Sequence, residues 1–433
     1  MAGFILYSTR FMNKNQRTYN STSMLSALLA FCFILYPQSS FALSLHGFAE
    51  GAYGQRFEDD TTKYDDYNLI EARLQIRGTY APDLAEDLEP EFVLKGDLLY
   101  DGYEEITKGN LREGYLSLTP HDMIDMKIGR QILTWGTGDL LFINDLFPKD
   151  YVSFFIGRDD EYLKLPSDAF KASVFLEHFS ADIVIIPEFE ANNSITGKRL
   201  SYYSQYSAAI VGEEGSFKAD EPDSKTENWE KAIRIYGNIG RTEAALYYFD
   251  GFYKDPKGFD ANPYYPELRV IGISLRGPLA GGIANFEAGH YNSLEDEDGT
   301  DPLIENSSVK AFAGYEKDLG SDLKVGIQYQ YEHMIEYDKF LAAGGSASRD
   351  EDQHLWTVRL TKLAMSQNLR LGLFAFYAPY DKDYHLRPNA NYKFTDNLST
   401  TLGANIFQGE EEYTFFGQLT RNDNVYIRVR YNF

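Results

Sequence analysis

The sequence predicts an all-β protein, a transmembrane antiparallel β-barrel of about 18 strands. Short segments in which apolar and polar residues alternate recur along the chain, and the connections between them alternate between short turns and longer acidic loops. No apolar run after position 42 approaches the roughly 18 residues of a membrane-spanning helix. A protein built from strands crosses a bilayer only as a closed barrel, because unpaired edge groups cannot be hydrated there.

Residues 1–42 have the layout of a secretory signal peptide. A basic region without acidic residues leads into an apolar run at 24–36 and then to the small-residue site 40–42. The basic residues are Arg10, Lys14 and Arg17. Met1, Met12 and Met24 are alternative starts, and Met12 is favoured because it keeps two of the three basic residues. We expect cleavage near Ala42, which leaves the barrel to residues 43–433.

The balance of charge and the use of cysteine exclude several kinds of chemistry. The chain has a net charge of −24, which becomes −27 once the three basic residues of the signal peptide are removed. Such acidity argues against nucleic acid as a partner. The single cysteine, Cys32, lies in the apolar run, so the barrel contains no disulfide, thiolate metal site or cysteine nucleophile.

The expected strands show a period of two, most clearly at 68–80. There Ile70 and Leu74 face one way, and Glu71 and Arg73 face the other. The expected strands are 45–55, 68–80, 88–100, 109–119, 123–130, 168–179, 182–188, 229–238, 243–250, 268–276, 282–292, 307–316, 322–332, 353–363, 368–378, 385–394, 399–407 and 424–433.

The connections agree with this count of strands. With both termini in the periplasm, the tight turns fall on one side and the long loops on the other; the turns include 81–87, 120–122, 180–181, 318–321 and 395–398. Sixteen strands is the alternative even number. The segment 414–419 could form one more strand, but we assign it to the last outer loop, because otherwise the C-terminus would lie outside the cell.

The last strand resembles the C-terminal signal of bacterial outer-membrane β-barrels. Residues 425–433 alternate strictly and end with Tyr431 and Phe433 on the apolar face. This resemblance implies the outer membrane of a Gram-negative bacterium, with the barrel-assembly machinery, membrane lipid and lipopolysaccharide as partners. An ordinary strand of a soluble sheet is the alternative reading of this stretch alone.

A second resemblance lies at 129–138, which reads G-R-Q-I-L-T-W-G-T-G. It is similar to a porin-like outer-membrane family in which a G-R-Q-x-x-x-W-G segment opens a long loop after an early strand. The C-terminal F-G-Q-L-T-R-N-D-N-V-Y-I-R-V-R-Y-N-F resembles the last loop and strand of that family, and the layout more distantly resembles alginate-export barrels. The resemblance implies a channel and does not indicate a substrate.

The long segment 131–167 is expected to fold into the barrel. Its residues 140–147 are too apolar for an outer loop in water, and it carries more acidic than basic side chains. The residues expected at the constriction are Arg130, Trp135, Asp139, Asp145 and Lys149. The alternative is that the segment packs on the barrel wall without narrowing the pore.

Strand alternation places more basic than acidic side chains in the lumen. A basic wall is expected from strands that become neighbours when the barrel closes: Arg73, Arg77, Arg359, Arg370, Arg387, Lys393, Arg428 and Arg430. Fixed charges of this kind select the ions that pass through a pore. The alternative is that these cations pair with nearby acids and only hydrate the wall.

These features predict a porin-like channel for passive diffusion of small polar, anionic solutes. We expect no cofactor, no metal and no catalytic residue, since no hydrolase, phosphate-loop or metalloprotease motif occurs. Two other functions stay open: a polysaccharide or lipid export barrel acting with a periplasmic partner, and a barrel enzyme with a pair such as His354 and Ser346 at its rim. Homo-oligomerisation is left open as well.

Overall fold

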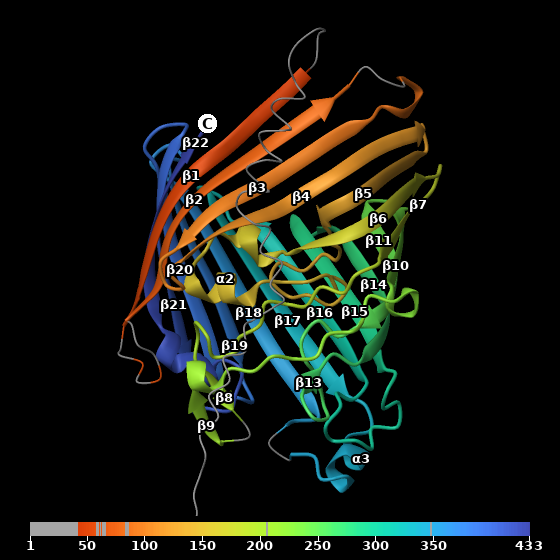
Figure 1. Ribbon diagram of the computed structural model, residues 1–433, viewed down its shortest axis with the longest axis vertical. Helices are drawn as coiled ribbons and strands as arrows, with labels where there is room; N and C mark the ends of the chain where they lie inside the picture. Colours follow the sequence, from red (N-terminus) through yellow and green to blue (C-terminus); the bar gives the residue numbers. More distant parts are fainter. Residues whose placement is uncertain are drawn as a thin grey trace, which may run out of the picture.

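The computed structural model describes residues 42–57, 60, 62, 66–82, 86–204, 207–346 and 349–433, and it shows a closed antiparallel β-barrel. Eighteen strands form one sheet, and each pairs with its neighbours along the chain. The first and last strands, β1 and β22, pair from Phe48 opposite Asn432 to Arg56 opposite Asn424 and so close the cylinder (Figure 1). The expected signal peptide falls almost wholly on residues 1–41, outside the described residues.

All eighteen expected strands are confirmed, each within a few residues at its ends. The barrel strands are β1 Ala42–Arg56, β2 Tyr67–Ala81, β3 Glu91–Asp101, β4 Ile106–His121, β5 Ile124–Ile132, β6 Pro166–Phe175, β7 Ser180–Ile186, β10 Glu230–Ile239, β11 Thr242–Phe252, β14 Glu267–Leu279, β15 Gly282–Ser293, β16 Ser308–Asp318, β17 Leu323–Met334, β18 Asp352–Ala364, β19 Leu369–Ala378, β20 Asp383–Lys393, β21 Leu398–Gln408 and β22 Asn424–Asn432.

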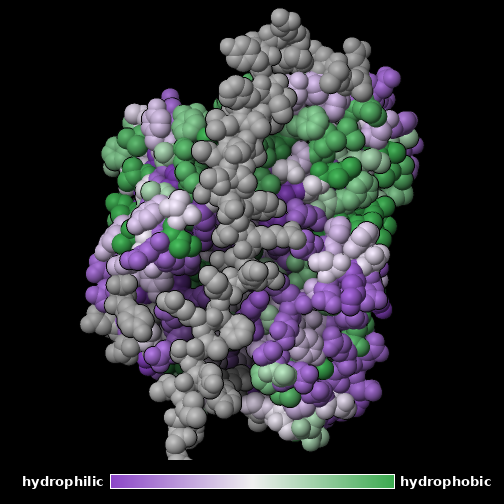
Figure 2. Space-filling view, in the orientation of Figure 1, coloured by the Kyte–Doolittle hydropathy of each residue, from purple (hydrophilic) through white to green (hydrophobic). Residues whose placement is uncertain are grey.

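The outer face of the barrel is apolar, the reverse of a soluble protein. Along β22, Val425, Ile427 and Val429 are exposed, whereas Tyr426 and Arg428 are buried inside. A continuous exposed apolar surface of this kind marks contact with membrane lipid. Hydrophobic residues cover much of the upper part of the visible wall, and hydrophilic residues dominate its lower end (Figure 2).

The remaining elements belong to the connections. The helices are α2 Tyr151–Ile156, α3 Tyr337–Ala342, η1 Glu86–Leu88, η2 Asp160–Leu163, η3 Glu213–Gly215, η4 Thr226–Asn228 and η5 Gly417–Asn422, and the short strand pairs are β8 Tyr202–Ser204 with β9 Ala209–Val211 and β12 Gly258–Phe259 with β13 Pro263–Tyr264. The C-terminus lies at the upper end of Figure 1, and α3, β8, β9 and β13 lie at the lower end. Segment 414–419 forms no strand, as expected.

The expected turn at 180–181 is wrong. Ser180 and Ala181 begin β7, where they pair with Phe175 and Val174 of β6. The chain turns instead at 176–179, where the Leu176 N–H donates to the Phe179 carbonyl at 2.9 Å. Leu176 and Phe179 of this turn are apolar, and for that reason the sequence did not mark the end of β6.

A β-bulge in β4 also departs from simple alternation. The register between β3 and β4 shifts between Lys95 and Gly96, which pair with Glu113 and Leu111, so Arg112 is the extra residue. A bulge of this kind breaks the regular alternation of side chains. As a result Arg112 points into the barrel, where its guanidinium donates to the carbonyls of Glu161 and Lys164 at 2.8 and 3.1 Å.

Candidate functional site in the barrel lumen

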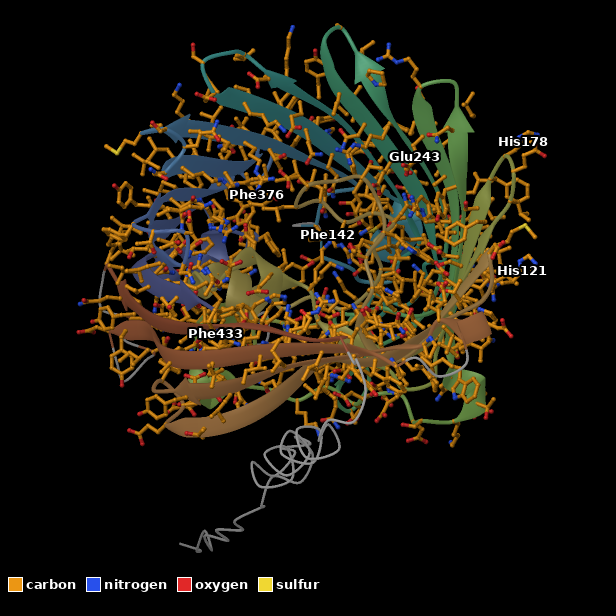
Figure 3. The ribbon with its side chains drawn as sticks, turned by 90° about the horizontal axis from the view of Figure 1, so that it is seen from above. His121, Phe142, His178, Glu243, Phe376 and Phe433 are labelled. Atoms are coloured by element: carbon orange, nitrogen blue, oxygen red, sulfur yellow. The ribbon has the colours of Figure 1, made fainter. Side chains whose placement is uncertain are left out.

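The segment between β5 and β6 lies inside the barrel. Its buried apolar side chains pack with lumen-facing side chains of the wall, among them Phe312, Phe374, Phe376 and Phe407. Seen down the barrel, Phe142 of this segment and Phe376 of β19 lie inside the ring of strands, and His121 and His178 lie at its edge (Figure 3). We call residues 133–165 the inner loop.

A single wall carboxylate holds the start of the inner loop. Glu287, buried on β15, accepts hydrogen bonds from the backbone N–H groups of Thr137, Gly138 (3.1 Å) and Asn144 (3.1 Å). The glycines of the W-G-T-G stretch suit this bend, because Gly136 has a φ of 82° and a Cβ at Gly138 would collide with the Leu141 carbonyl oxygen.

The far part of the inner loop faces the basic wall with three consecutive acids. Asp159 pairs with Arg428 at 2.8 Å and Asp160 pairs with Arg387 at 3.1 Å. Glu161 lies 3.3 Å from both Arg430 and Lys95. The acids hold the loop against β20, β22 and β3, and one side of the lumen becomes a layer of alternating charge.

The remaining acid of the loop that reaches the wall is Asp139, which pairs with Arg359 of β18 at 2.5 and 2.6 Å. Burial raises the pKa of Asp139, and the Arg359 charge opposes this shift. For Asp159, burial again favours a raised pKa, but the charges of Arg428 and Arg430 outweigh it and lower the pKa.

Asp145 and Lys149 do not reach the pore. They pair with each other at 3.1 Å inside the loop, where both are buried. The Lys149 ammonium also donates to the Phe147 carbonyl at 2.6 Å, and burial lowers the pKa of Lys149 against the opposing charge of Asp145. This pair shapes the loop rather than the surface that a solute meets.

Arg130 and Trp135 take different positions. Arg130 shares the outward register of Ile128 and pairs with Asp168 at 3.1 Å and Glu190 at 2.8 Å, so its guanidinium does not narrow the lumen. Trp135 lies in the lumen, with its ring centroid 5.1 Å from that of Phe147 and 6.0 Å from that of Tyr247 on β11.

The eight expected wall cations fall into two groups. Five are in ion pairs with acids of the wall or of the inner loop: Arg73, Arg359, Arg387, Arg428 and Arg430. Arg77, Arg370 and Lys393 are exposed and form no salt bridge within the described part of the chain. No ion pair in that part of the chain compensates their charges.

Sequence reasoning missed a buried charge network that joins two loops to the wall. Glu71 and Asp101, on β2 and β3, hold Arg158 of the inner loop and Arg199 of the connection between β7 and β10. Strand alternation indicated that Glu71 faces inward. Nothing in the sequence showed that residues around 199 return to strands so far away along the chain.

That connection, of which residues 187–204 and 207–229 are described, crosses to the opposite side of the barrel. It starts beside the inner loop, where Asn193 Nδ2 donates to Asp150 at 2.8 Å. It then reaches η5, where the Ser201 N–H donates to Asn422 Oδ1 at 3.1 Å. Leu200 and Ser201 are fully buried there. The expected outer loop is therefore, in part, a cover over the lumen.

Among the described residues, no group of three or more His, Cys, Asp or Glu side chains could hold a metal ion. No helix in the described part of the chain is both long and apolar enough to span a membrane.

Comparison with known proteins found no matching family model and no matching curated protein. The chain is similar to three solved structures from Pseudomonas aeruginosa. OccD3 (OpdP) gives a TM-score of 0.56 at 10% identity over 90% of this chain and 91% of that one. OccK2 (OpdF) in complex with glucuronate gives 0.56 at 10% over 90% and 97%, and OpdK with vanillate gives 0.56 at 10% over 90% and 98%. At this identity the likeness establishes the fold, which is that of a porin-like outer-membrane barrel.

Proposed function

We propose that this protein is an outer-membrane channel for passive diffusion of small polar, anionic solutes. The observation that carries the proposal is the position of the exposed cations Arg77, Arg370 and Lys393 on the lumen face, beside five wall arginines that are paired with acids. The net charge of −24 resides on the whole chain, whereas a permeating solute meets the charges that line the lumen.

The physical argument rests on where the charges lie. Coulomb interactions are stronger between low-dielectric walls than in solvated loops, so a few uncompensated lumen cations outweigh many acids outside. The acids of the inner loop could cancel this field, but Asp159 and Asp160 are already paired with Arg428 and Arg387. Two of the structures with this fold were solved with the carboxylates glucuronate and vanillate, which supports an anionic solute.

The proposal includes the route by which the protein reaches its membrane. Cleavage near Ala42 would release a chain that begins within β1, and Phe433 would present the terminal aromatic to the barrel-assembly machinery. Lipopolysaccharide and lipid would contact the outer face, with a small polar solute inside and no nucleic acid partner.

The test is the reversal potential of the purified channel in a planar bilayer under a salt gradient. Replacing Arg77, Arg370 and Lys393 together by Gln should shift it toward cations, most strongly at low ionic strength. A wild-type channel that already prefers cations would contradict the anionic part of the proposal.

A second triple variant and a control sharpen this test. Arg73, Arg387 and Arg428 are paired, so their replacement by Gln should also shift selectivity toward cations, but with looser packing of the inner loop because their acids lose partners. Lys231→Gln changes an exposed outward-facing lysine of β10 and should leave the reversal potential unchanged.

A further inference from the structure

Two cavities in the lumen meet at the ion pair between Asp139 and Arg359. The first, of about 350 Å³, lies against β14 to β18 and is lined by Asp139, Arg276, Asn285, Lys324, Gln328 and Arg359. The second, of about 290 Å³, reaches β20 to β22 and is lined by Arg359, Arg370, Arg387, Asn389, Thr401 and Arg428. Arg359 and Phe374 are the two side chains that line both cavities.

We call this ion pair between the two cavities the partition. The Asp139 side of the partition is held in place. The two preceding residues, Thr137 and Gly138, donate their backbone N–H groups to Glu287, and the Thr137 carbonyl accepts from Asn285 Nδ2 at 2.7 Å. Since the backbone before Asp139 is tied to β15 in this way, its carboxylate has little freedom to follow a moving partner.

The Arg359 side is free to move. Its guanidinium lies 5.7 Å from the centre of the Phe374 ring, and Asp139 is its single salt-bridge partner within the described residues. The two side chains are 33% and 30% exposed, so water weakens their attraction. A long arginine side chain can therefore leave Asp139 for another acceptor.

We infer that Arg359 is an exchange site at which a permeating oxyanion replaces the carboxylate of Asp139 and so joins the two cavities. A guanidinium binds a carboxylate or phosphate through two parallel N–H···O bonds, which chloride cannot accept in the same way. Arg276 in the first cavity and Arg370 in the second are exposed and, within the described residues, without a salt bridge, so each would draw an anion toward the partition. The inference rests on the proposed channel function.

Single-channel currents of the whole protein, in chloride with increasing acetate, test this exchange. For the wild type, acetate should raise the conductance, although acetate is less mobile than chloride in water. In chloride alone, the conductance of Asp139→Asn should already equal the higher value that acetate produces in the wild type, roughly twofold above the wild type in chloride. Acetate should not raise it further. Arg359→Gln should lose the acetate response as well.

Two further variants separate the ion pair from general effects of charge. Glu316→Gln removes an acid that lines the same first cavity but pairs with Lys324 at 2.9 Å instead of with Arg359, and it should keep the acetate response. The double variant Asp139→Arg with Arg359→Asp restores an ion pair, and its conductance in chloride should return to the low value of the wild type.

The outcomes distinguish the two proposals. An Asp139→Asn channel with the conductance and acetate response of the wild type would overturn the exchange and leave the channel function intact. No ion current from a wild-type protein that migrates as a folded barrel on a detergent gel would overturn the channel function and the exchange with it. Each variant is checked on the same gel, so that a lost response is not a lost fold.

Discussion

Glu287 on β15 binds Gly138 of the inner loop through a hydrogen bond of 3.1 Å from the Gly138 N–H to Glu287 Oε1, across 149 positions of sequence. Its other oxygen accepts from Asn144, through the backbone at 3.1 Å and the side chain at 3.0 Å. One carboxylate thus binds both ends of the segment 137–144. The carboxylate thereby satisfies the backbone N–H groups of Thr137, Gly138 and Asn144, and the apolar residues between those ends pack inside the barrel.

Replacement of this carboxylate should loosen the inner loop. Hydrogen bonds to a charged acceptor contribute about 1.5–3 kcal/mol each. Glu287→Gln keeps the shape but loses the charge and one acceptor, so we expect the local stability of residues 137–144 to fall by about 2 kcal/mol. Hydrogen exchange measured by mass spectrometry should show faster exchange in that segment.

The control for Glu287→Gln is Glu332→Gln. Glu332 also faces the lumen, but it pairs with Lys310 at 3.0 Å and makes no ion pair with the inner loop. Its replacement should leave exchange in residues 137–144 unchanged. Equal exchange in the wild type and in Glu287→Gln would show that apolar packing and the ion pairs of the inner loop hold this segment without the Glu287 carboxylate.

The contact between Ser201 and Asn422 should keep the cover 187–229 in place. Asn422 accepts from the Ser201 N–H at 3.1 Å and donates to the Ser201 carbonyl at 2.9 Å, and both residues are fully buried. Asn422→Ala leaves two buried backbone groups unpaired, at a cost of about 1–3 kcal/mol each. We expect thermolysin, which cleaves before apolar residues, to reach Leu200 faster in this variant.

Asn397→Ala serves as the matched control for that experiment. Asn397 bonds the Asn432 carbonyl at 2.9 Å in an exposed turn next to the C-terminus, far from the cover. In Asn397→Ala, thermolysin should cleave before Leu200 at the wild-type rate. If Asn422→Ala behaves in the same way, the network of Arg199 and Asp101 is sufficient to hold the cover.

The barrel could be predicted from the sequence because lipid lies on one side of every strand and water or polar groups on the other. That difference imposes a period of two on each strand, and all eighteen expected strands are present. The misplaced turn at 180–181 and the bulge at Arg112 have a common cause. In both places the alternation of apolar and polar residues does not show which residues pair across neighbouring strands.

The lumen was less predictable, because its contacts join residues far apart in sequence. Alternation placed Arg428 inside, but its partner Asp159 lies 269 positions away on a loop that has no period. Such contacts between residues far apart in sequence decide which wall cations are paired and which are exposed. For the same reason the roles of Arg158 and Arg199 had no signal in the sequence beyond their charge.

The C-terminal aromatic should be needed for assembly. Phe433 closes the barrel through reciprocal backbone bonds of 3.0 Å with Gly47, and its exposed ring lies where a Cβ at Gly47 would be 2.7 Å from Cζ. Phe433→Ser should lower the fraction of heat-modifiable, assembled barrel in the outer membrane and leave precursor in the periplasm. The control is Phe394→Ser, at an exposed aromatic residue that follows β20 at the same end of the barrel as Phe433. This variant should assemble normally. Normal assembly of Phe433→Ser would show that β22 is an ordinary strand.

Acid should loosen the loops around Glu305, between β15 and β16. Burial alone would raise the pKa of Glu305, but the charges of Lys257 and Arg349 and a hydrogen bond from Arg349 lower it to about 2. A carboxyl group whose pKa is depressed in the folded state stabilises that state fully above its unfolded pKa, near 4.5, and loses this contribution as the pH falls toward 2.

The pKa difference corresponds to about 3 kcal/mol of local stability, held at neutral pH and lost between about pH 4.5 and pH 2. Hydrogen exchange of the segments around Glu305 and Arg349, corrected for the intrinsic pH dependence of exchange, should accelerate across that window in the wild type. In Glu305→Gln these segments should exchange faster at neutral pH and show no further loss of protection in acid, because the titrating group is absent. A wild-type protein whose protection is unchanged between pH 6 and pH 3 would contradict the stabilising role of the contacts that Lys257 and Arg349 make with Glu305.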